Sequence, residues 1–430
     1  MNLKEVKGVT FIDGGVCASK GFKANGIHCG LAHKPLTDTE ANSAIANNAL
    51  PTKKKNDLAL IVADKECTAS AVYTTNKVKG APILVTKEHI KDGIAKAVIV
   101  NSVNANTCNA DGVEKAQKMC SLVSAETGID ENDIIVASTG VIGQILPIEP
   151  IANGMKELVS GLTYDGNSRA VEAIMTTDTQ VKEVAVQFEI SGKTCTMGGM
   201  LKGSGMIHPN MATTLTFITT DVDISAELLQ RALSDVVNIT LNRVSVDGDT
   251  STNDMVCVLA NGTAGNSPIK SENEDYEKFI NALYAVMMNL ARKMARDGEG
   301  ATKLIECVCH GADIEKTAEI VAKSVITSSL FKAAMFGEDA NWGRILCAVG
   351  YADADFDINR VCVSIGSAQG SIDVCKNGAG VEFSEEKAKE ILSEEEILID
   401  ISIGDGAGKA IAWGCDLTYD YVKINGDYRS

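Results

Sequence analysis

The feature that most constrains this chain is a glycine-rich segment that runs directly into a predicted strand. The segment is Gly198-Gly-Met-Leu-Lys-Gly-Ser-Gly-Met-Ile-His-Pro-Asn-Met-Ala-Thr-Thr-Leu215. Its glycines at 198, 199, 203 and 205 permit positive φ and close approach of backbones, and Pro209 stiffens the turn that follows. The chain must therefore pass through a tight turn before an apolar run at 215–219 begins a strand.

The Ala212-Thr213 junction at the end of this segment is suited to self-cleavage. A threonine hydroxyl beside a strained peptide bond can attack the preceding carbonyl, and hydrolysis of the resulting ester frees an N-terminal threonine. The freed α-amine, whose pKa is typically about 7.7–8.0, can then act as base for its own hydroxyl. The alternative is a glycine-rich loop that simply feeds a strand. A phosphate loop fits less well, because Lys202-Gly-Ser-Gly departs from the order G-x-x-x-x-G-K-[ST].

Short apolar runs along the chain predict strands. Runs at 58–62, 97–100 and 134–137 are typical of buried strands, and the run at 397–403 predicts a further strand. The runs at 215–219 and 361–365 alternate more clearly, so one face of each is expected to meet water or a site.

Two segments predict helices. Ser271 and Glu274 fit a capping box that opens a helix ending near Gly298, with methionines as core filling. A second helix is expected over 111–126. Its inward positions are Val113, Met119, Leu122 and Val123. Because helices and strands do not alternate strictly, we predict an α+β fold with helices layered on sheets.

Two further segments bear on chemistry. Ser138-Thr-Gly140 follows the strand at 134–137, where a hydroxyl and a backbone N–H could line an oxyanion hole. The acidic run from Asp247 to Asp254 suggests either a cation site or, as we favour, a hydrogen-bonded turn. None of the five histidines lies in a Ser-His or Cys-His triad context, and His208 is expected at the surface.

Composition excludes several classes of function. At 430 residues the chain is long enough for two lobes, and its net charge of −17 argues against nucleic acid or an anionic membrane as partner. No leader and no apolar run of about 20 residues is seen, which predicts a cytoplasmic protein.

The thirteen cysteines are scattered along the chain, and we expect them to be reduced and buried, with no metal site. The basic triplet Lys53-Lys-Lys55 is expected on a solvated loop.

Read together, these segments resemble the ornithine acetyltransferase (glutamate N-acetyltransferase) family. The stretch from Lys202 to Leu215 is similar to that family's cleavage-site signature. Other similar blocks are spread along almost the whole chain. They are Gly21-Phe-Lys-Ala24, Tyr73-Thr-Thr-Asn-Lys-Val-Lys-Gly-Ala-Pro82, Asn101-Ser-Val-Asn-Ala-Asn106, Ala137-Ser-Thr-Gly-Val-Ile-Gly143, Met175-Thr-Thr-Asp-Thr179, Ser245-Val-Asp-Gly-Asp-Thr-Ser-Thr-Asn-Asp254, Asp297-Gly-Glu-Gly-Ala-Thr-Lys303, Phe336-Gly-Glu-Asp-Ala-Asn-Trp-Gly-Arg344 and Tyr421-Val-Lys-Ile-Asn-Gly-Asp-Tyr-Arg-Ser430.

The resemblance implies a self-cleaving enzyme with a layered αββα sandwich of the N-terminal-nucleophile-like type and a smaller C-terminal lobe. Residues 1–212 would form an α chain and residues 213–430 a β chain, assembled as a heterotetramer of two α and two β chains. Thr213 would take acetyl from N-acetylornithine and pass it to glutamate in a ping-pong cycle of arginine biosynthesis. No cofactor is implied; acetyl-CoA stays open as a second acetyl donor.

The resemblance also assigns site residues. Thr139 and Gly140 match the family's oxyanion-hole pair. The positions that match its substrate contacts are Thr176, Lys202, Thr213, Glu299, Asn425 and Ser430. The family usually ends in Thr where this chain has Ser430, which keeps the hydroxyl. Lys202 is a natural partner for the α-carboxylate that both substrates share. Glu299 would either bind a substrate ammonium group or assist proton transfer.

Two other functions stay open from the residues themselves. The same threonine nucleophile with water as acceptor would give a self-processing aminopeptidase or amidase. An uncut loop would instead fit a non-catalytic binding or assembly protein.

Overall fold

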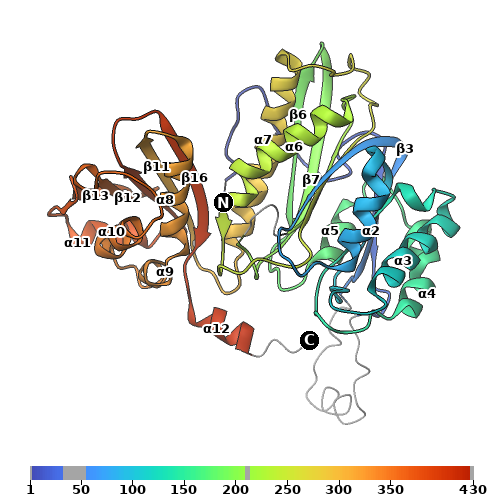
Figure 1. Ribbon diagram of the computed structural model, residues 1–430, viewed down its shortest axis with the longest axis horizontal. Helices are drawn as coiled ribbons and strands as arrows, with labels where there is room; N and C mark the ends of the chain where they lie inside the picture. Colours follow the sequence, from blue (N-terminus) through green and yellow to red (C-terminus); the bar gives the residue numbers. More distant parts are fainter. Residues whose placement is uncertain (1, 32–54, 209–213, 427–430) are drawn as a thin grey trace, which may run out of the picture.

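The computed structural model describes residues 2–31, 55–208 and 214–426, which form two lobes around two β-sheets (Figure 1). The larger lobe holds a nine-stranded sheet in the order β1-β6-β7-β8-β10-β3-β4-β5, with β2 paired to β3. Its strands are β1 (Thr10–Ile12), β2 (Phe22–Ile27), β3 (Leu58–Tyr73), β4 (Ile94–Asn101), β5 (Ile134–Ser138), β6 (Lys182–Ile190), β7 (Lys193–Lys202), β8 (Leu215–Thr220) and β10 (Met255–Ala260).

The long strand β3 divides this sheet into two halves. Residues 58–63 pair with β2, whereas residues 68–73 pair with β10. The strand β4 pairs with residues 58–62 and, after a register shift, with Cys67 and Thr68. Side chains of both halves meet in one core cluster, where Ile61 and Val98 join Phe217 and Cys257. The two halves therefore pack on each other through this shared cluster.

Helices cover the outer face of each half. On the side of β3, β4 and β5 lie α2 (Ala81–His89), α3 (Gly112–Thr127) and α4 (Ile148–Ser160), and on the side of β6, β7 and β8 lie α6 (Ala226–Ile239) and α7 (Glu274–Arg296). The helix α5 (Asn167–Ile174) packs on β2 and β3 within the shared cluster. This order of layers is the predicted αββα sandwich.

The strand β8 differs from its expected half-exposed character. All six of its residues are buried, because β8 lies between β7 and β10 and both of its faces are covered. Phe217 packs between the halves and Ile218 packs towards α6 and α7. The threonines are accommodated by hydrogen bonds, for example from Thr219 Oγ1 to the carbonyl of Val16 at 2.7 Å.

The predicted helices are found with corrected details. The helix α7 begins at Glu274 and its cap is Asn273, which accepts from the N–H of Tyr276 at 3.1 Å; the capping box at Ser271 was wrong. Its methionines are buried, as expected. In α3, Met119 and Val123 are buried and Leu122 is half-buried, but Val113 is 41% exposed, so its inward assignment was wrong.

The smaller C-terminal lobe is built on a seven-stranded sheet in the order β14-β13-β12-β15-β11-β16-β9. The strands are β9 (Val244–Ser245), β11 (Leu304–Ala312), β12 (Cys362–Ser367), β13 (Gly370–Lys376), β14 (Ala379–Gly380), β15 (Glu396–Ser402) and β16 (Gly408–Cys415). The strand β12 alternates between buried and half-buried residues, as its sequence predicted. The helices of this lobe are α8 (Glu315–Thr327), α9 (Ser329–Phe336), α10 (Trp342–Gly350) and α11 (Glu385–Leu392). After β16 the chain continues into α12 (Tyr419–Gly426).

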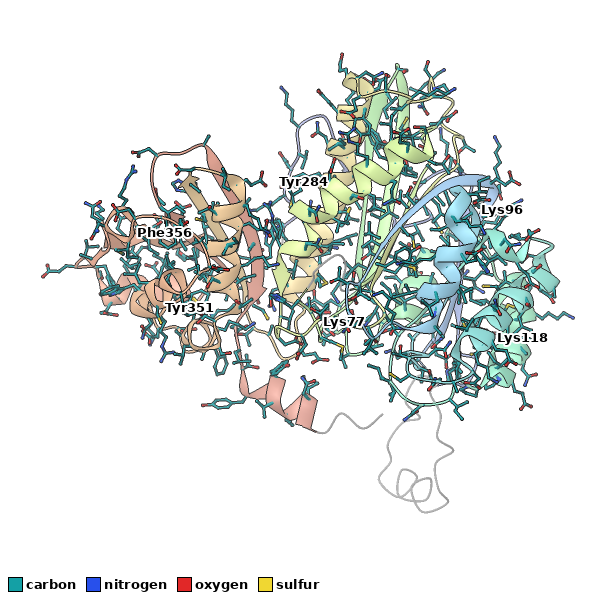
Figure 2. The ribbon with its side chains drawn as sticks, viewed as in Figure 1. Lys77, Lys96, Lys118, Tyr284, Tyr351 and Phe356 are labelled. Carbon is teal, nitrogen blue, oxygen red and sulfur yellow. The ribbon has the colours of Figure 1, made fainter. Side chains whose placement is uncertain are left out.

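The helix α7 joins the two lobes. Trp413 of β16 is buried in the cluster around α7, and its Nε1 donates to Glu306 Oε2 at 3.0 Å. Arg292 of α7 donates to Glu396 of β15 at 2.7 Å. Figure 2 shows Tyr284 of α7 between the lobes, while Lys118 points outward from α3. The lobes are thus held by both apolar and ionic contacts.

Two predictions from composition can be compared with the burial of side chains. Eight of the thirteen cysteines are buried and two, Cys108 and Cys347, are exposed. Lys53 and Lys54 lie outside the described residues, whereas Lys55 is exposed. Among the described residues no helix is long and apolar enough to cross a membrane.

The shared cluster between the sheet halves predicts a large stability loss when Phe217 is truncated. Phe217 is fully buried, so Phe217→Ala should lower the free energy of unfolding by about 3–5 kcal/mol through lost burial and a new cavity. Val113→Ala, on the exposed side of α3, should change it by no more than about 0.5 kcal/mol. Urea denaturation of both variants measures this; equal midpoints would contradict the four-layer packing.

Candidate active site

The ends of several elements meet around one cavity of about 350 Å³. The loops that follow β5, α5 and β7 supply one part of its wall, and the loop before β10, the segment after α7 and α12 supply the other. The lining residues are Ala105, Thr139, Gly140, Val141, Ile142, Thr176, Thr177, Lys202, Gly205, Met206, Ser251, Thr252, Asn253, Glu299 and Asn425. Six residues assigned from sequence therefore lie together, although up to 286 positions separate them (139 to 425).

Lys202 is the cation of this cavity. It is the last residue of β7 and half-buried, and its Nζ donates to Thr139 Oγ1 at 3.4 Å. Removal from water lowers the pKa of Lys202, and the neighbouring carboxylate of Asp178 opposes this shift.

The turn after β5 presents a hydroxyl and a backbone N–H. The N–H of Thr139 donates to Asn101 O and that of Val141 to Val103 O, both at 3.0 Å. The N–H of Gly140 between them has no hydrogen-bond partner among residues 2–31, 55–208 and 214–426. A Cβ on Gly140, whose φ is +129°, would lie 2.1 Å from Val103 O, so glycine is required there. The Gly140 N–H and the Thr139 hydroxyl are thus the groups available to an oxyanion.

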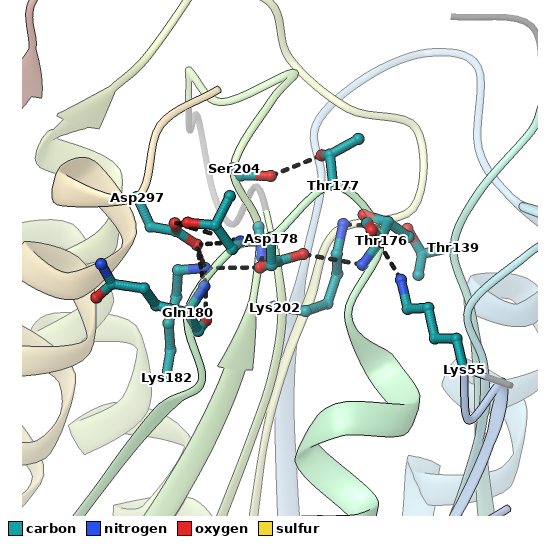
Figure 3. A network of polar contacts seen from close by, with 12 residues as sticks. Lys55, Thr139, Thr176, Thr177, Asp178, Gln180, Lys182, Lys202, Ser204 and Asp297 are labelled. Atoms are coloured by element: carbon teal, nitrogen blue, oxygen red, sulfur yellow. Dashed lines mark hydrogen bonds and ion pairs between the residues drawn. The ribbon is translucent and has the colours of Figure 1, made fainter. Parts of the chain in front are cut away.

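A buried ionic network lies behind the loop after α5 and the end of β7 (Figure 3). Lys182 donates to Asp178 at 2.7 Å and pairs with Asp297, and all three side chains are at most 3% exposed. Asp178 also accepts from the N–H groups of Thr176 at 2.9 Å and of Gly203 at 2.7 Å. Burial alone would raise the pKa of Asp178, but Lys182 and Lys202 outweigh it and hold this pKa well below its usual range.

Sequence reasoning missed this network. Asp178 lies inside the block Met175-Thr-Thr-Asp-Thr179 and Lys182 stands four residues later, at the start of β6. The spacing of Asp178 and Lys182, four residues apart just before a strand, was the available signal, because a buried lysine needs a carboxylate partner.

Glu299 is held in the cavity wall by its neighbours. It is 8% exposed, its N–H donates to Ser204 O at 2.9 Å, and its Oε2 accepts from Asn425 Nδ2 at 2.7 Å. A Cβ on Gly205 would lie 2.3 Å from this carboxylate, so Gly205 is needed for the close approach. The short helix α12, set off from the smaller lobe in Figure 1, thereby places Asn425 at the cavity.

Three assigned positions, Ala212, Thr213 and Ser430, lie outside the described residues. The next residue after the junction is Thr214, whose carbonyl accepts from the N–H of Met255 at 2.8 Å. Leu215 then pairs with Lys202 across the β7–β8 ladder.

Other sequence expectations near the cavity have definite outcomes. Within the acidic run Asp247 accepts from the N–H of Asp249 at 3.2 Å, as in the favoured hydrogen-bonded turn. Asp247 also accepts from the N–H groups of Met206 at 2.6 Å and Ile207 at 2.9 Å, which ties this run to the glycine-rich segment. His208 was expected at the surface but is half-buried, and its Nδ1 lies 3.1 Å from Ser245 Oγ. Burial lowers the pKa of His208. The described residues contain no group of three or more His, Cys, Asp or Glu that could hold a metal ion.

Comparisons with known proteins agree with the resemblance. The arginine biosynthesis bifunctional protein ArgJ 1 of Clostridium acetobutylicum is 47% identical over 93% of this chain and 98% of its own length. The ArgJ protein of Caldanaerobacter subterraneus is 46% identical over 97% of this chain and 99% of its own length. A crystal structure of argJ from Bacillus halodurans is 46% identical and covers 49% of this chain and 98% of that chain, with a TM-score of 0.47. The sequence profile of the ArgJ family matches residues 43–430, and the chain belongs to this family.

Proposed function

We propose that this chain is a glutamate N-acetyltransferase of arginine biosynthesis that transfers acetyl from N-acetylornithine to glutamate. The observation that carries the proposal is the cavity, which gathers an oxyanion pair, a cation and a carboxylate from segments on both sides of the Ala212-Thr213 junction. Two relatives that are 46–47% identical to this chain carry the name arginine biosynthesis bifunctional protein.

The first step is self-cleavage between Ala212 and Thr213. The Thr213 hydroxyl attacks the Ala212 carbonyl carbon, the peptide C–N bond breaks, and water hydrolyses the ester. This gives an α chain of residues 1–212 and a β chain of residues 213–430. Lys202 and Leu215 pair at the ends of β7 and β8, so the segment that contains the junction connects two adjacent strands.

Acetyl transfer then uses the new N-terminus. The Thr213 hydroxyl attacks the acetyl carbonyl of N-acetylornithine, and its proton passes to its own α-amine. The oxyanion accepts from the Thr139 hydroxyl and the Gly140 N–H. The amide C–N bond breaks, the α-amine of ornithine leaves with the proton, and an acetyl-threonine ester remains. In the second half of the cycle the α-amine of glutamate attacks the carbonyl of this ester and the ester C–O bond breaks. The Thr213 oxygen regains a proton from the attacking amine, and N-acetylglutamate leaves.

The charges of the cavity suit both substrates. Lys202 provides an ammonium for the α-carboxylate that N-acetylornithine and glutamate share. Glu299 provides a carboxylate for the ornithine ammonium or for proton transfer. We further propose that α and β chains assemble as a cytoplasmic heterotetramer and that acetyl-CoA can serve as a second donor.

Purified protein incubated with N-acetylornithine and glutamate tests the transfer. N-acetylglutamate should form in step with ornithine, whereas acetate release without N-acetylglutamate would mean a hydrolase. Replacing N-acetylornithine by acetyl-CoA in the same assay decides the second donor.

Thr213→Ala should give one uncut, inactive chain near 45.4 kDa, because alanine has no hydroxyl to attack Ala212. Thr213→Ser keeps the hydroxyl and should still be cut. Intact-mass spectrometry and the transfer assay measure both variants; normal cutting of Thr213→Ala would refute the assigned junction.

Lys202→Met should raise the KM for both substrates about 10- to 100-fold, because a charged hydrogen bond of about 1.5–3 kcal/mol is lost. Lys118→Met, on the exposed face of α3, is the matched control and should leave KM unchanged. If KM stays constant in Lys202→Met, the lysine does not bind the substrate carboxylate.

Lys202 also predicts a pH dependence. Its pKa is lowered, so it loses its charge below the pH at which an ordinary lysine would, and KM should rise on the alkaline side. Lys202→Arg keeps its charge at every accessible pH and should abolish this rise, even if its KM at neutral pH is higher. Profiles of KM against pH for the two proteins measure the effect; identical profiles would contradict it.

A further inference from the structure

Asn253 uses every hydrogen-bonding position of its amide. It lines the cavity and is 6% exposed. Its Nδ2 donates to Ala105 O at 2.6 Å and to Ser138 O at 2.9 Å. Its Oδ1 accepts from the hydroxyls of Thr107 and Thr252, each at 2.6 Å. This amide is therefore fixed in one orientation.

One of these bonds fixes the turn that carries the oxyanion pair. Ser138 O and the Thr139 N–H belong to the same peptide group, and Asn253 holds the oxygen while Asn101 O holds the N–H. Beyond Gly140, the Val141 N–H is held by Val103 O. The peptide group that presents the Gly140 N–H is thus flanked by two fixed peptide groups.

The same loop is tied to the start of β8. Two residues after Asn253, the N–H of Met255 donates to Thr214 O at 2.8 Å, and Met255 pairs in register with Leu215. The carbonyl of the intervening Asp254 accepts from Thr74 N at 3.0 Å. A span of three residues, 253 to 255, therefore connects the strand that begins after the junction with the turn at 138–140.

We propose that Asn253 is a positioning residue that sets the oxyanion pair relative to β8, the strand that follows the assigned nucleophile in the chain. The inference rests on the proposed function. Asn253 lies in the β chain and Ser138 in the α chain of the cut enzyme, so this hydrogen bond aligns groups across the two chains. Because the oxyanion exists only in the transition state, loss of alignment lowers kcat and leaves KM unchanged.

Asn253→Asp tests this, because a carboxylate of the same shape cannot donate to two carbonyl oxygens. Asn266→Asp is the matched control. Asn266 is also 6% exposed and also donates to two carbonyls, those of Asp223 at 3.1 Å and Ser267 at 2.9 Å, but does not line the cavity. Rates are taken per cut protein, with the cut fraction read from intact masses.

For Asn253→Asp we expect kcat to fall about 100-fold, near the lower end of what losing one oxyanion donor costs, with KM within about twofold of the wild type. Asn266→Asp should keep the wild-type kcat. Equal kcat in the two variants, or a change confined to KM, would overturn the inference. Failure of the proposed function looks different, since the wild type itself would then transfer no acetyl.

Thr107→Val provides a milder second variant if Asn253→Asp remains uncut. It keeps the side-chain shape but removes one of the two hydroxyls that orient the Asn253 amide. We expect kcat to fall about fivefold at constant KM, in line with the roughly 1 kcal/mol of one hydrogen bond. An unchanged kcat in Thr107→Val would count against the role of Asn253.

Discussion

The pairing of Lys182 with Asp178 and Asp297 is the interaction on which the site depends. Three charges lie within the protein, and their desolvation is offset only because nearly every lone pair and proton has a partner. Asp178 fixes the backbone beside Thr176 and at Gly203, and Asp297 accepts from the N–H of Thr179 at 3.1 Å. The loop after α5, the end of β7 and the end of α7 are thereby held to one another. Removing a single partner of such a group typically costs about 3–5 kcal/mol.

The sequence correctly predicted the strands whose own residues are apolar on both faces. The runs at 58–62 and 134–137 became strands because apolar branched residues fill both faces of an internal layer. The same double burial explains the error at 215–219, since the alternation of Leu, Thr and Phe suggested a wet face that helices α6 and α7 in fact cover. The inward prediction for Val113 was wrong because an apolar residue on a helix is buried only where another element covers it. Among the described residues no such cover lies over Val113 in the first turn of α3, and its side chain is exposed.

The candidate site was predictable only as a set of residues. The family resemblance assigned Thr139, Lys202 and Glu299 to one site, and all three line the cavity. Their support was not predictable, because Asp178, Asn253 and Asn101 act through backbone contacts that depend on the folded sheet. The glycines illustrate the difference. Of the four in the segment 198–205, only Gly203 has positive φ, whereas a Cβ on Gly198 would lie 1.9 Å from Gly15 O.

The position of the junction makes the proposed cleavage compatible with a stable fold. The strands β7 and β8 on either side are antiparallel neighbours with six paired positions, from Met197↔Thr220 to Lys202↔Leu215, and β8 pairs with β10 over six more. A cut between them would leave these ladders and the shared core in place, so the two chains would stay associated. The turn that presents the Gly140 N–H would keep its anchors as well, because Asn101, Val103 and Asn253 hold it through contacts that such a cut does not remove. The oxyanion groups would therefore stay in fixed positions, as electrostatic stabilisation of acyl transfer requires.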